Sequence, residues 1–275
     1  MKHNLLHSKN VPARSWWSFM LVQSTVFIRN AKKWAVPPHS LKSEWLDEPN
    51  ISRQDLVSNF RDIALINRWF GGVSLVEKSL RPMLPPVSGM TKLKLLDLAT
   101  GVADVPLALA HKWQSRYKLA ITVLDLNPVI TELARQAATH AGIADFEAHA
   151  ADIFAYDFDF QAGPPYDFVT CSLAFHHFSS EQCLAMLGLM ARLARRGFVV
   201  NDLERSWFGY LGAHLLGLTL TRHRLTRHDG PLSVLRAFTP AEFSALVQAA
   251  PLPADFSVKV KKGPFSRLAI VGQRK

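Results

Sequence analysis

Three aspartates stand at the ends of short apolar runs, and each run is followed by a turn or a helix-like stretch. Asp97 closes the first run, Asp125 the second and Asp152 the third. A carboxylate at the end of the second run can accept hydrogen bonds from both hydroxyls of a ribose, and one at the end of the third can meet an adenine amino group. Gly101 lies in the turn after Asp97, where glycine permits positive φ and a close approach of backbone to ligand. These residues predict a nucleotide-type site.

Such a site needs a sheet whose strand ends meet at one edge, and the sequence from Lys92 onward supplies the pattern for one. Apolar runs alternate with amphipathic stretches, which predicts a parallel sheet covered on both faces and a ligand at the carboxyl ends of its strands. The expected strands are 92–98, 119–126, 145–152, 166–173 and 198–203, and the expected helices are 105–113, 128–142 and 181–197. Residues 255–275 are expected to form two further strands in an antiparallel hairpin.

Two other segments bear on the site. Residues 44–90 are expected to form a helical lid or subdomain in front of the sheet, with a helix over 59–72. Residues 206–221 are almost entirely apolar, and the basic stretch 221–228 follows them. The apolar segment is either a core helix or a wall that faces a hydrophobic acceptor, with the cations near a membrane surface. Thr239, followed by Pro240 and Glu242, predicts the start of a helix.

The composition of the 275 residues excludes a disordered or fibrous chain, since 48% are hydrophobic and 20% charged. Cys171 and Cys183 lack the CxxC spacing of a cysteine zinc site, and a reducing, cytoplasmic location is expected. The net charge is +10, but seven cations and no acid precede Glu44, so the remainder carries only +3 from 25 cations and 22 acids. No nucleic-acid partner is expected.

The basic N-terminal extension, residues 1–43, contains an apolar run at 15–28. This run is shorter than the ~20 residues of a membrane-spanning helix. Three alternatives remain for it: an anchor at a membrane surface, a cap on the domain, or an extension without fixed structure.

Residues 92–275 resemble the class I S-adenosylmethionine-dependent methyltransferases. DLATGVAD is similar to the glycine-rich first motif of this family, in the variant of the quinone-biosynthesis methyltransferases, and VLDLNP, AADIF and YDFVTCSLAFHHF are similar to the second, third and fourth motifs. The resemblance implies an α/β, Rossmann-like, doubly wound, seven-stranded and mostly parallel sheet with a C-terminal antiparallel hairpin. It places the methyltransferase domain at residues 91–275, after the N-terminal extension and the helical segment.

The resemblance also implies S-adenosylmethionine as cofactor and a set of residues that contact it. It assigns Asp97 and Gly101 to the methionine portion, Asp125 to the ribose, and Asp152 with Ile153 to the adenine. The implied cofactor-binding set is Asp97, Ala99, Gly101, Asp125, Leu126, Asp152, Ile153 and Ser172. Ala99 and Ala103 depart from the family, which usually has glycine at both positions, and alanine tolerates positive φ poorly.

Two other functions use parts of the same pattern. A nicotinamide-dependent dehydrogenase needs GxGxxG, and the sequence after Gly101 lacks the second and third glycines. A non-catalytic binding module would have lost the cofactor through its two alanines and would act through its basic N-terminus.

Methyl transfer from a sulfonium mainly requires alignment, and a base is needed only where the acceptor must lose a proton. His176 and His177 follow the fourth strand and are the candidate catalytic residues, while Arg227 and His228 are candidates for substrate contact. The expected acceptor is the hydroxyl of a small hydrophobic or phenolic molecule, with methylation on carbon as the near alternative. No metal is expected, because Asn201 and Asp202 at the fifth strand have no carboxylate partner on the fourth.

Overall fold

The computed structural model describes residues 36–48, 50–87, 89–161, 163–221 and 223–275, and Pro37–Lys275 form one compact unit. The apolar run at 15–28 lies outside the described residues, as does Arg222 of the basic stretch.

A single mixed sheet organises this unit, with the order β3-β2-β1-β4-β5-β7-β6 in the described part of the chain. Strands β1 to β5 pair in parallel, and β7 runs antiparallel to both β5 and β6. The predicted Rossmann-like sheet with its C-terminal hairpin is therefore confirmed. The strands are β1 (Thr91–Leu98), β2 (Tyr117–Asp125), β3 (Phe146–Ala150), β4 (Tyr166–Ser172), β5 (Ala194–Leu203), β6 (Phe256–Gly263) and β7 (Arg267–Arg274).

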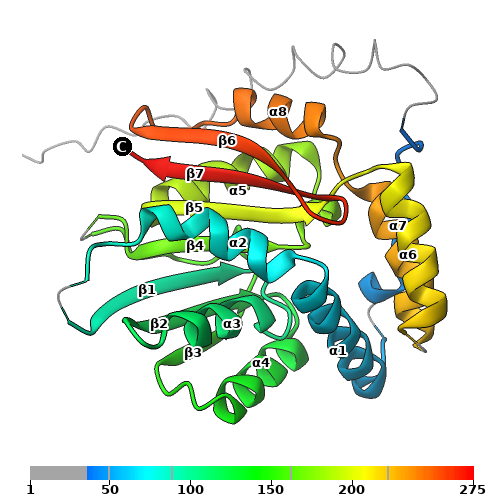
Figure 1. The fold of residues 1–275 in the computed structure, drawn as a ribbon, viewed down its shortest axis with the longest axis horizontal. Coiled ribbons are helices and arrows are strands. Elements are labelled where there is room, and N and C mark those ends of the chain that lie inside the picture. The colour runs from blue at the N-terminus through cyan, green and yellow to red at the C-terminus, as the bar shows by residue number, and fades with distance from the viewer. Residues whose placement is uncertain (1–35, 49, 88, 162, 222) are drawn as a thin grey trace, which may run out of the picture. The chain divides into compact units, whose positions relative to one another are not determined.

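Helices cover both faces of the sheet, and others lie beyond the carboxyl ends of the parallel strands (Figure 1). Helices α2, α3 and α4 pack on one face and α5 and α8 on the other, while α1, α6 and α7 lie beyond the strand ends. The helices are α1 (Arg53–Trp69), α2 (Gly72–Leu80), α3 (Asp104–Trp113), α4 (Pro128–His140), α5 (Ser180–Leu193), α6 (Trp207–Thr219), α7 (Arg224–Arg236) and α8 (Pro240–Ala249).

The central strand β1 shows why the sheet is buried on both sides. Successive side chains of a strand point to opposite faces, and Leu93 and Leu95 enter the core under α2 and α3, whereas Leu96 and Leu98 enter the core under α5. All four are at most 2% exposed. A strand buried on both faces is stable only between two layers of helices. This packing holds the carboxyl end of β1 in a fixed position.

Several predicted element boundaries are wrong, among them the helix expected over 59–72, which is α1 at Arg53–Trp69. The helix expected over 181–197 ends at Leu193, and Ala194 already pairs with β4. Gly197 is a strand residue rather than a helix stop, since it pairs with Phe168 of β4. A Cβ there would lie 2.3 Å from Sδ of Met83. Arg227 and His228, expected on a loop, belong to α7, which continues through Pro231. Leu225, Leu232 and Val234 of this helix are buried, so its packing outweighs the helix-breaking effect of Gly230 and Pro231.

Helix α6 decides between the two interpretations of the apolar segment. Gly217 is the one buried residue of the helix, and Phe208, Leu211 and Leu218 are 64–73% exposed. The core-helix interpretation is therefore wrong. None of the described helices is both long and apolar enough to cross a membrane.

Candidate active site

The turn between β1 and α3 has an unusual backbone. Ala99, Gly101 and Ala103 all have positive φ, at 51°, 57° and 61°. Alanine in this region costs roughly 1–2 kcal/mol, so the two alanines retain a conformation that glycine adopts more readily. At Gly101 an alanine would also be crowded, since a Cβ would lie 2.8 Å from Cε1 of Phe60 on α1. The sequence prediction of a tight turn is confirmed.

Asp97 lies beneath this turn and is 2% exposed. Thr100 and Thr170 donate hydroxyl hydrogen bonds to its two carboxylate oxygens at 2.6 and 2.5 Å. Burial raises the pKa of Asp97 to about 7, despite these two hydrogen bonds, which lower it. The charged form of Asp97 is therefore disfavoured unless a cationic or hydrogen-bonding ligand contacts the carboxylate.

Asp125 ends β2 directly beside the turn. Its two carboxylate oxygens accept hydrogen bonds from the backbone N–H of Gly101 at 3.0 Å and of Asn127 at 3.1 Å. Burial raises the pKa of Asp125, and these hydrogen bonds oppose the shift. Each oxygen retains a lone pair for a further donor, as a ribose would require.

Asp152 lies at the third strand end in an environment of mixed polarity. It is exposed, and its carboxylate accepts the backbone N–H of Phe154 at 2.9 Å. Ile153 is buried, while Leu126 remains 74% exposed. Apolar side chains beside a carboxylate suit a flat, partly polar ring.

One cavity of about 1190 Å³ unites these residues. Pockets for a single drug-sized ligand commonly measure ~300–1,000 Å³, so this cavity is larger than that range. The whole predicted cofactor set lines the cavity, together with both candidate catalytic histidines. Ser172 adds a buried hydroxyl that finds no hydrogen-bond partner among the described residues.

His176 is held at the wall of this cavity by the end of β5. The carboxylate of Asp202 accepts the His176 backbone N–H at 3.0 Å and lies 2.7 Å from Nδ1. Burial alone would raise the pKa of Asp202, but its interactions with the imidazole outweigh burial and lower it. The side-chain partner of Asp202 is therefore an imidazole, and β4 supplies no carboxylate beside it.

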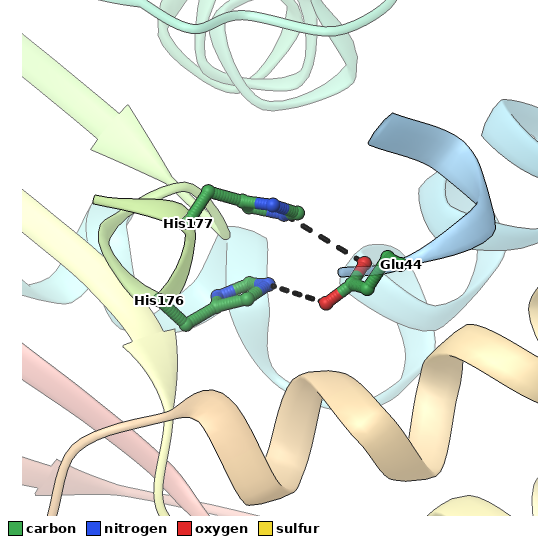
Figure 2. Close-up of side chains that lie close together, drawn as sticks. All are labelled: Glu44, His176 and His177. Carbon is green, nitrogen blue, oxygen red and sulfur yellow. Dashed lines mark ion pairs between the residues drawn. The ribbon is translucent and has the colours of Figure 1, made fainter. Parts of the chain in front are cut away.

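Glu44 completes a cluster with the two histidines, and sequence analysis missed it. Its carboxylate lies 3.7 Å from Nε2 of His176 and 3.8 Å from Nε2 of His177 (Figure 2). The side chain of Glu44 is 3% exposed and that of His177 24%. Burial raises the pKa of Glu44 to about 7, although His177 and Ser233 lower it. His177 uses its other ring nitrogen toward Asp47, with Nδ1 3.1 Å from the carboxylate.

Polar side chains on one face of α7 hold Glu44 and the residues after it in position. Asp229 accepts the backbone N–H groups of Trp45 and Leu46 at 2.9 and 3.0 Å, and Ser233 donates to Glu44 at 2.8 Å. Asp229, Ser233 and Arg236 occupy positions i, i+4 and i+7 and so share one side of the helix. The spacing of these three polar residues can be read from the sequence. The segment that they contact, 44–47, lies about 190 residues away, so the contact cannot be predicted from the spacing alone.

Arg227 and His228, the candidate substrate residues, do not line the cavity. Arg227 donates from Nε to the carbonyl oxygens of Gly217 and Thr221 at 2.8 and 3.1 Å, which ties α7 to the end of α6. His228 stacks on Trp45 with ring centroids 3.8 Å apart. Both residues support the elements around the site.

Comparisons with known proteins bear on the domain and the fold. Residues 95–197 match a family model described as "Methyltransferase domain". The chain shares its fold with an S-adenosylmethionine-dependent methyltransferase from Aquifex aeolicus (14% identity, 82% of this chain and 100% of that chain, TM-score 0.53). It also shares it with the plantazolicin methyltransferase in complex with SAH (13% identity, 84% and 93%, TM-score 0.59).

A third structure with this fold is an O-methyltransferase family 2 protein from Planctomyces limnophilus in complex with apigenin. It is 17% identical at a TM-score of 0.52, and the match covers 83% of this chain but 63% of that one. No curated protein sequence matches the chain significantly. Residues 95–197 therefore form a methyltransferase domain, and the fold is that of S-adenosylmethionine-dependent methyltransferases.

S-adenosylmethionine is therefore the cofactor, and the residues of the cavity fit it. Gly101 lines the cavity in the positive-φ turn, and Asp125 offers lone pairs at the next strand end. Ser172 lines the same space, and its buried hydroxyl has no hydrogen-bond partner among the described residues. When bound, this cofactor supplies a methyl group on a cationic sulfur.

Proposed function

We propose that the enzyme transfers a methyl group from S-adenosylmethionine to the hydroxyl oxygen of a small hydrophobic or phenolic acceptor. The observation that carries this proposal is the presence of one cavity lined both by the strand-end acids and by the cluster Glu44–His176–His177. The first group of residues suits the cofactor, and the second suits a hydroxyl that must lose its proton.

For the cofactor we assign the roles that the strand ends suggest. Asp97 and Gly101 would contact the methionine portion, and Asp125 would accept the two ribose hydroxyls. Asp152 and Ile153 would contact the adenine. The hydrogen bond from Gly101 N–H to Asp125 supports this arrangement, because it fixes the carboxylate against the turn.

The walls away from the strand ends favour an apolar acceptor. Helices α1 and α6 contribute mainly aliphatic and aromatic side chains to the cavity, with Phe265 from the β6–β7 turn beside them. The lining from these helices includes Phe60, Ile63, Ile66, Phe208, Leu211, Leu215 and Leu216. A hydrophobic or aromatic molecule is bound well by such a surface. The apigenin complex of the Planctomyces limnophilus protein, which has the same fold, is consistent with an aromatic acceptor.

Removal of the acceptor proton requires a group within reach of the hydroxyl. The rings of His176 and His177 lie in the cavity wall, and His177 is the more accessible of the two. We assign the catalytic role to this pair, with Glu44 facing both Nε2 atoms. Carbon methylation of an electron-rich ring remains the alternative, since such a ring can also lose a proton to the cluster.

Incubation with methyl-labelled S-adenosylmethionine and a panel of phenols, quinols and their O-blocked analogues tests the proposal, with products identified by mass spectrometry. We expect label on oxygen and no product from the blocked analogues. Label on a ring carbon overturns the assignment of O-methylation. His177→Ala should lower the rate by about 10²–10⁴-fold if the cluster handles the proton, whereas His140→Ala, at an exposed histidine of α4, should not.

Titration with S-adenosylhomocysteine separates the enzyme from a non-catalytic module. We expect saturable binding that Asp125→Ala abolishes. Absence of binding at millimolar ligand would favour the module.

A further inference from the structure

The cluster Glu44–His176–His177 has a geometry that hydrogen bonding alone does not explain. The two carboxylate oxygens lie 3.7 and 3.8 Å from the Nε2 atoms of the two histidines. These distances exceed the 2.7–3.2 Å of an N–H···O hydrogen bond. One donor atom from each residue lies within 4.8 Å of the other two. Ligands of a single tetrahedral Zn²⁺ lie roughly 3.3 Å apart, so the three groups have nearly the spacing of a coordination sphere.

The opposite ring nitrogens are already engaged. Nδ1 of His176 lies 2.7 Å from Asp202, and Nδ1 of His177 lies 3.1 Å from Asp47. A carboxylate at Nδ1 keeps the proton there and leaves the Nε2 lone pair free, as for most histidines that bind metals. Two nitrogen lone pairs and a carboxylate thus converge on one point, and these groups repel one another unless a cation or protons lie between them.

The charges around the cluster favour a cation. Glu44, Asp47, Asp202 and Asp229 provide four carboxylates in and beside it, and Arg236 provides one guanidinium, 3.0 Å from Asp47.

We propose that Glu44, His176 and His177 bind one divalent first-row transition-metal ion of the Zn²⁺ class, with a coordination position open to the cavity. Two imidazoles and one carboxylate are the ligand set of several catalytic zinc sites and of non-haem iron sites. Mg²⁺ prefers oxygen ligands and is disfavoured. The sequence predicted no metal, because carboxylate ligands were considered only at the ends of the fourth and fifth strands, whereas Glu44 lies outside the sheet.

The site rests on the cluster geometry and not on the proposed acceptor. If both hold, Glu44, His176 and His177 would hold the ion, and it would supply a Lewis acid for the acceptor hydroxyl.

Metal binding can be measured without any acceptor. Protein without a histidine tag is purified, dialysed against a chelator and then titrated with Zn²⁺ by calorimetry, with metal content after desalting determined by mass spectrometry. We expect one equivalent of tightly bound Zn²⁺ in the wild type and in His140→Ala. Asp47→Asn, which keeps all three ligands, should weaken binding about 10–100-fold, and His177→Ala should weaken it more. Co²⁺ in place of Zn²⁺ should give the visible spectrum of a low-coordinate site, which His177→Ala removes.

S-adenosylhomocysteine affinity verifies that each variant is folded, since neither Asp47 nor His177 belongs to the cofactor set. Asp47 is 37% exposed, so Asp47→Asn remains an informative variant if His177→Ala is unstable. Zn²⁺ binding that is absent, or equal in wild type and His177→Ala, overturns the site. Two protonated imidazoles in the NMR spectrum at neutral pH, unchanged by Zn²⁺, also overturn it. Tight Zn²⁺ binding without O-methylation of any phenol would instead contradict the proposed function and leave the metal site intact.

Discussion

Replacing Gly101 by alanine is the sharpest test of how the cofactor turn is built. Gly101 has φ +57°, and an added Cβ would lie 2.8 Å from Cε1 and 3.2 Å from Cδ1 of Phe60. The left-handed backbone should cost about 1–2 kcal/mol in the free energy of unfolding. Phe60 is 9% exposed and must shift its ring, an overpacking effect that adds about 1–3 kcal/mol. The total destabilisation expected for Gly101→Ala is therefore about 2–5 kcal/mol.

Gly142 offers a matched control for this substitution. Its φ is +69°, and an added Cβ meets no atom within 4 Å, so Gly142→Ala should lose only the backbone contribution of about 1–2 kcal/mol. Both variants gain equally from the lower entropy of the unfolded chain, which cancels in the comparison. Urea denaturation gives both values, and Phe60→Leu should restore most of the extra loss in Gly101→Ala. Equal destabilisation by the two alanines would show that Phe60 does not press on the turn.

Three further predictions concern other parts of the molecule. Burial raises the pKa of Asp97 from 3.8 to about 7, so its contribution to stability is present below pH 3.8 and is lost as the pH rises through about 7. Asp97→Asn should therefore flatten the decline of the unfolding free energy between these pH values. An unchanged pH profile contradicts the shift. Thr239→Ala and Ser179→Ala each remove the hydroxyl of a capping box and should cost about 0.5–2 kcal/mol in urea denaturation, whereas the exposed Thr219→Ala should not. If α6 contacts a membrane, Leu218→Ser with Arg224→Gln should reduce sedimentation with anionic liposomes, and equal sedimentation of wild type and variant would refute this contact.

The sheet could be predicted because its information is local. Each central strand is a run of apolar residues that ends in an acid, and Pro128 and Thr239 mark helix starts by chemistry that needs no distant partner. Prediction failed where packing between distant segments decides the structure. Ala194–Gly197 read as the end of a helix, but pairing with β4 and close contact with Met83 make it a strand. Likewise Gly230 and Pro231 signalled a loop, yet the apolar residues around them hold a helix.

The site divides in the same way. The strand-end acids could be placed from sequence because a parallel sheet brings consecutive carboxyl ends to one edge whatever else the chain does. Glu44 could not, since its position depends on three residues of α7 that hold the segment 44–47 against the histidines. The resulting cluster is costly without a ligand, because it buries a carboxylate beside two imidazoles whose other nitrogens are already bound. This arrangement lies in the wall of the cavity beside three further carboxylates, which is a structural reason for a cation to bind there.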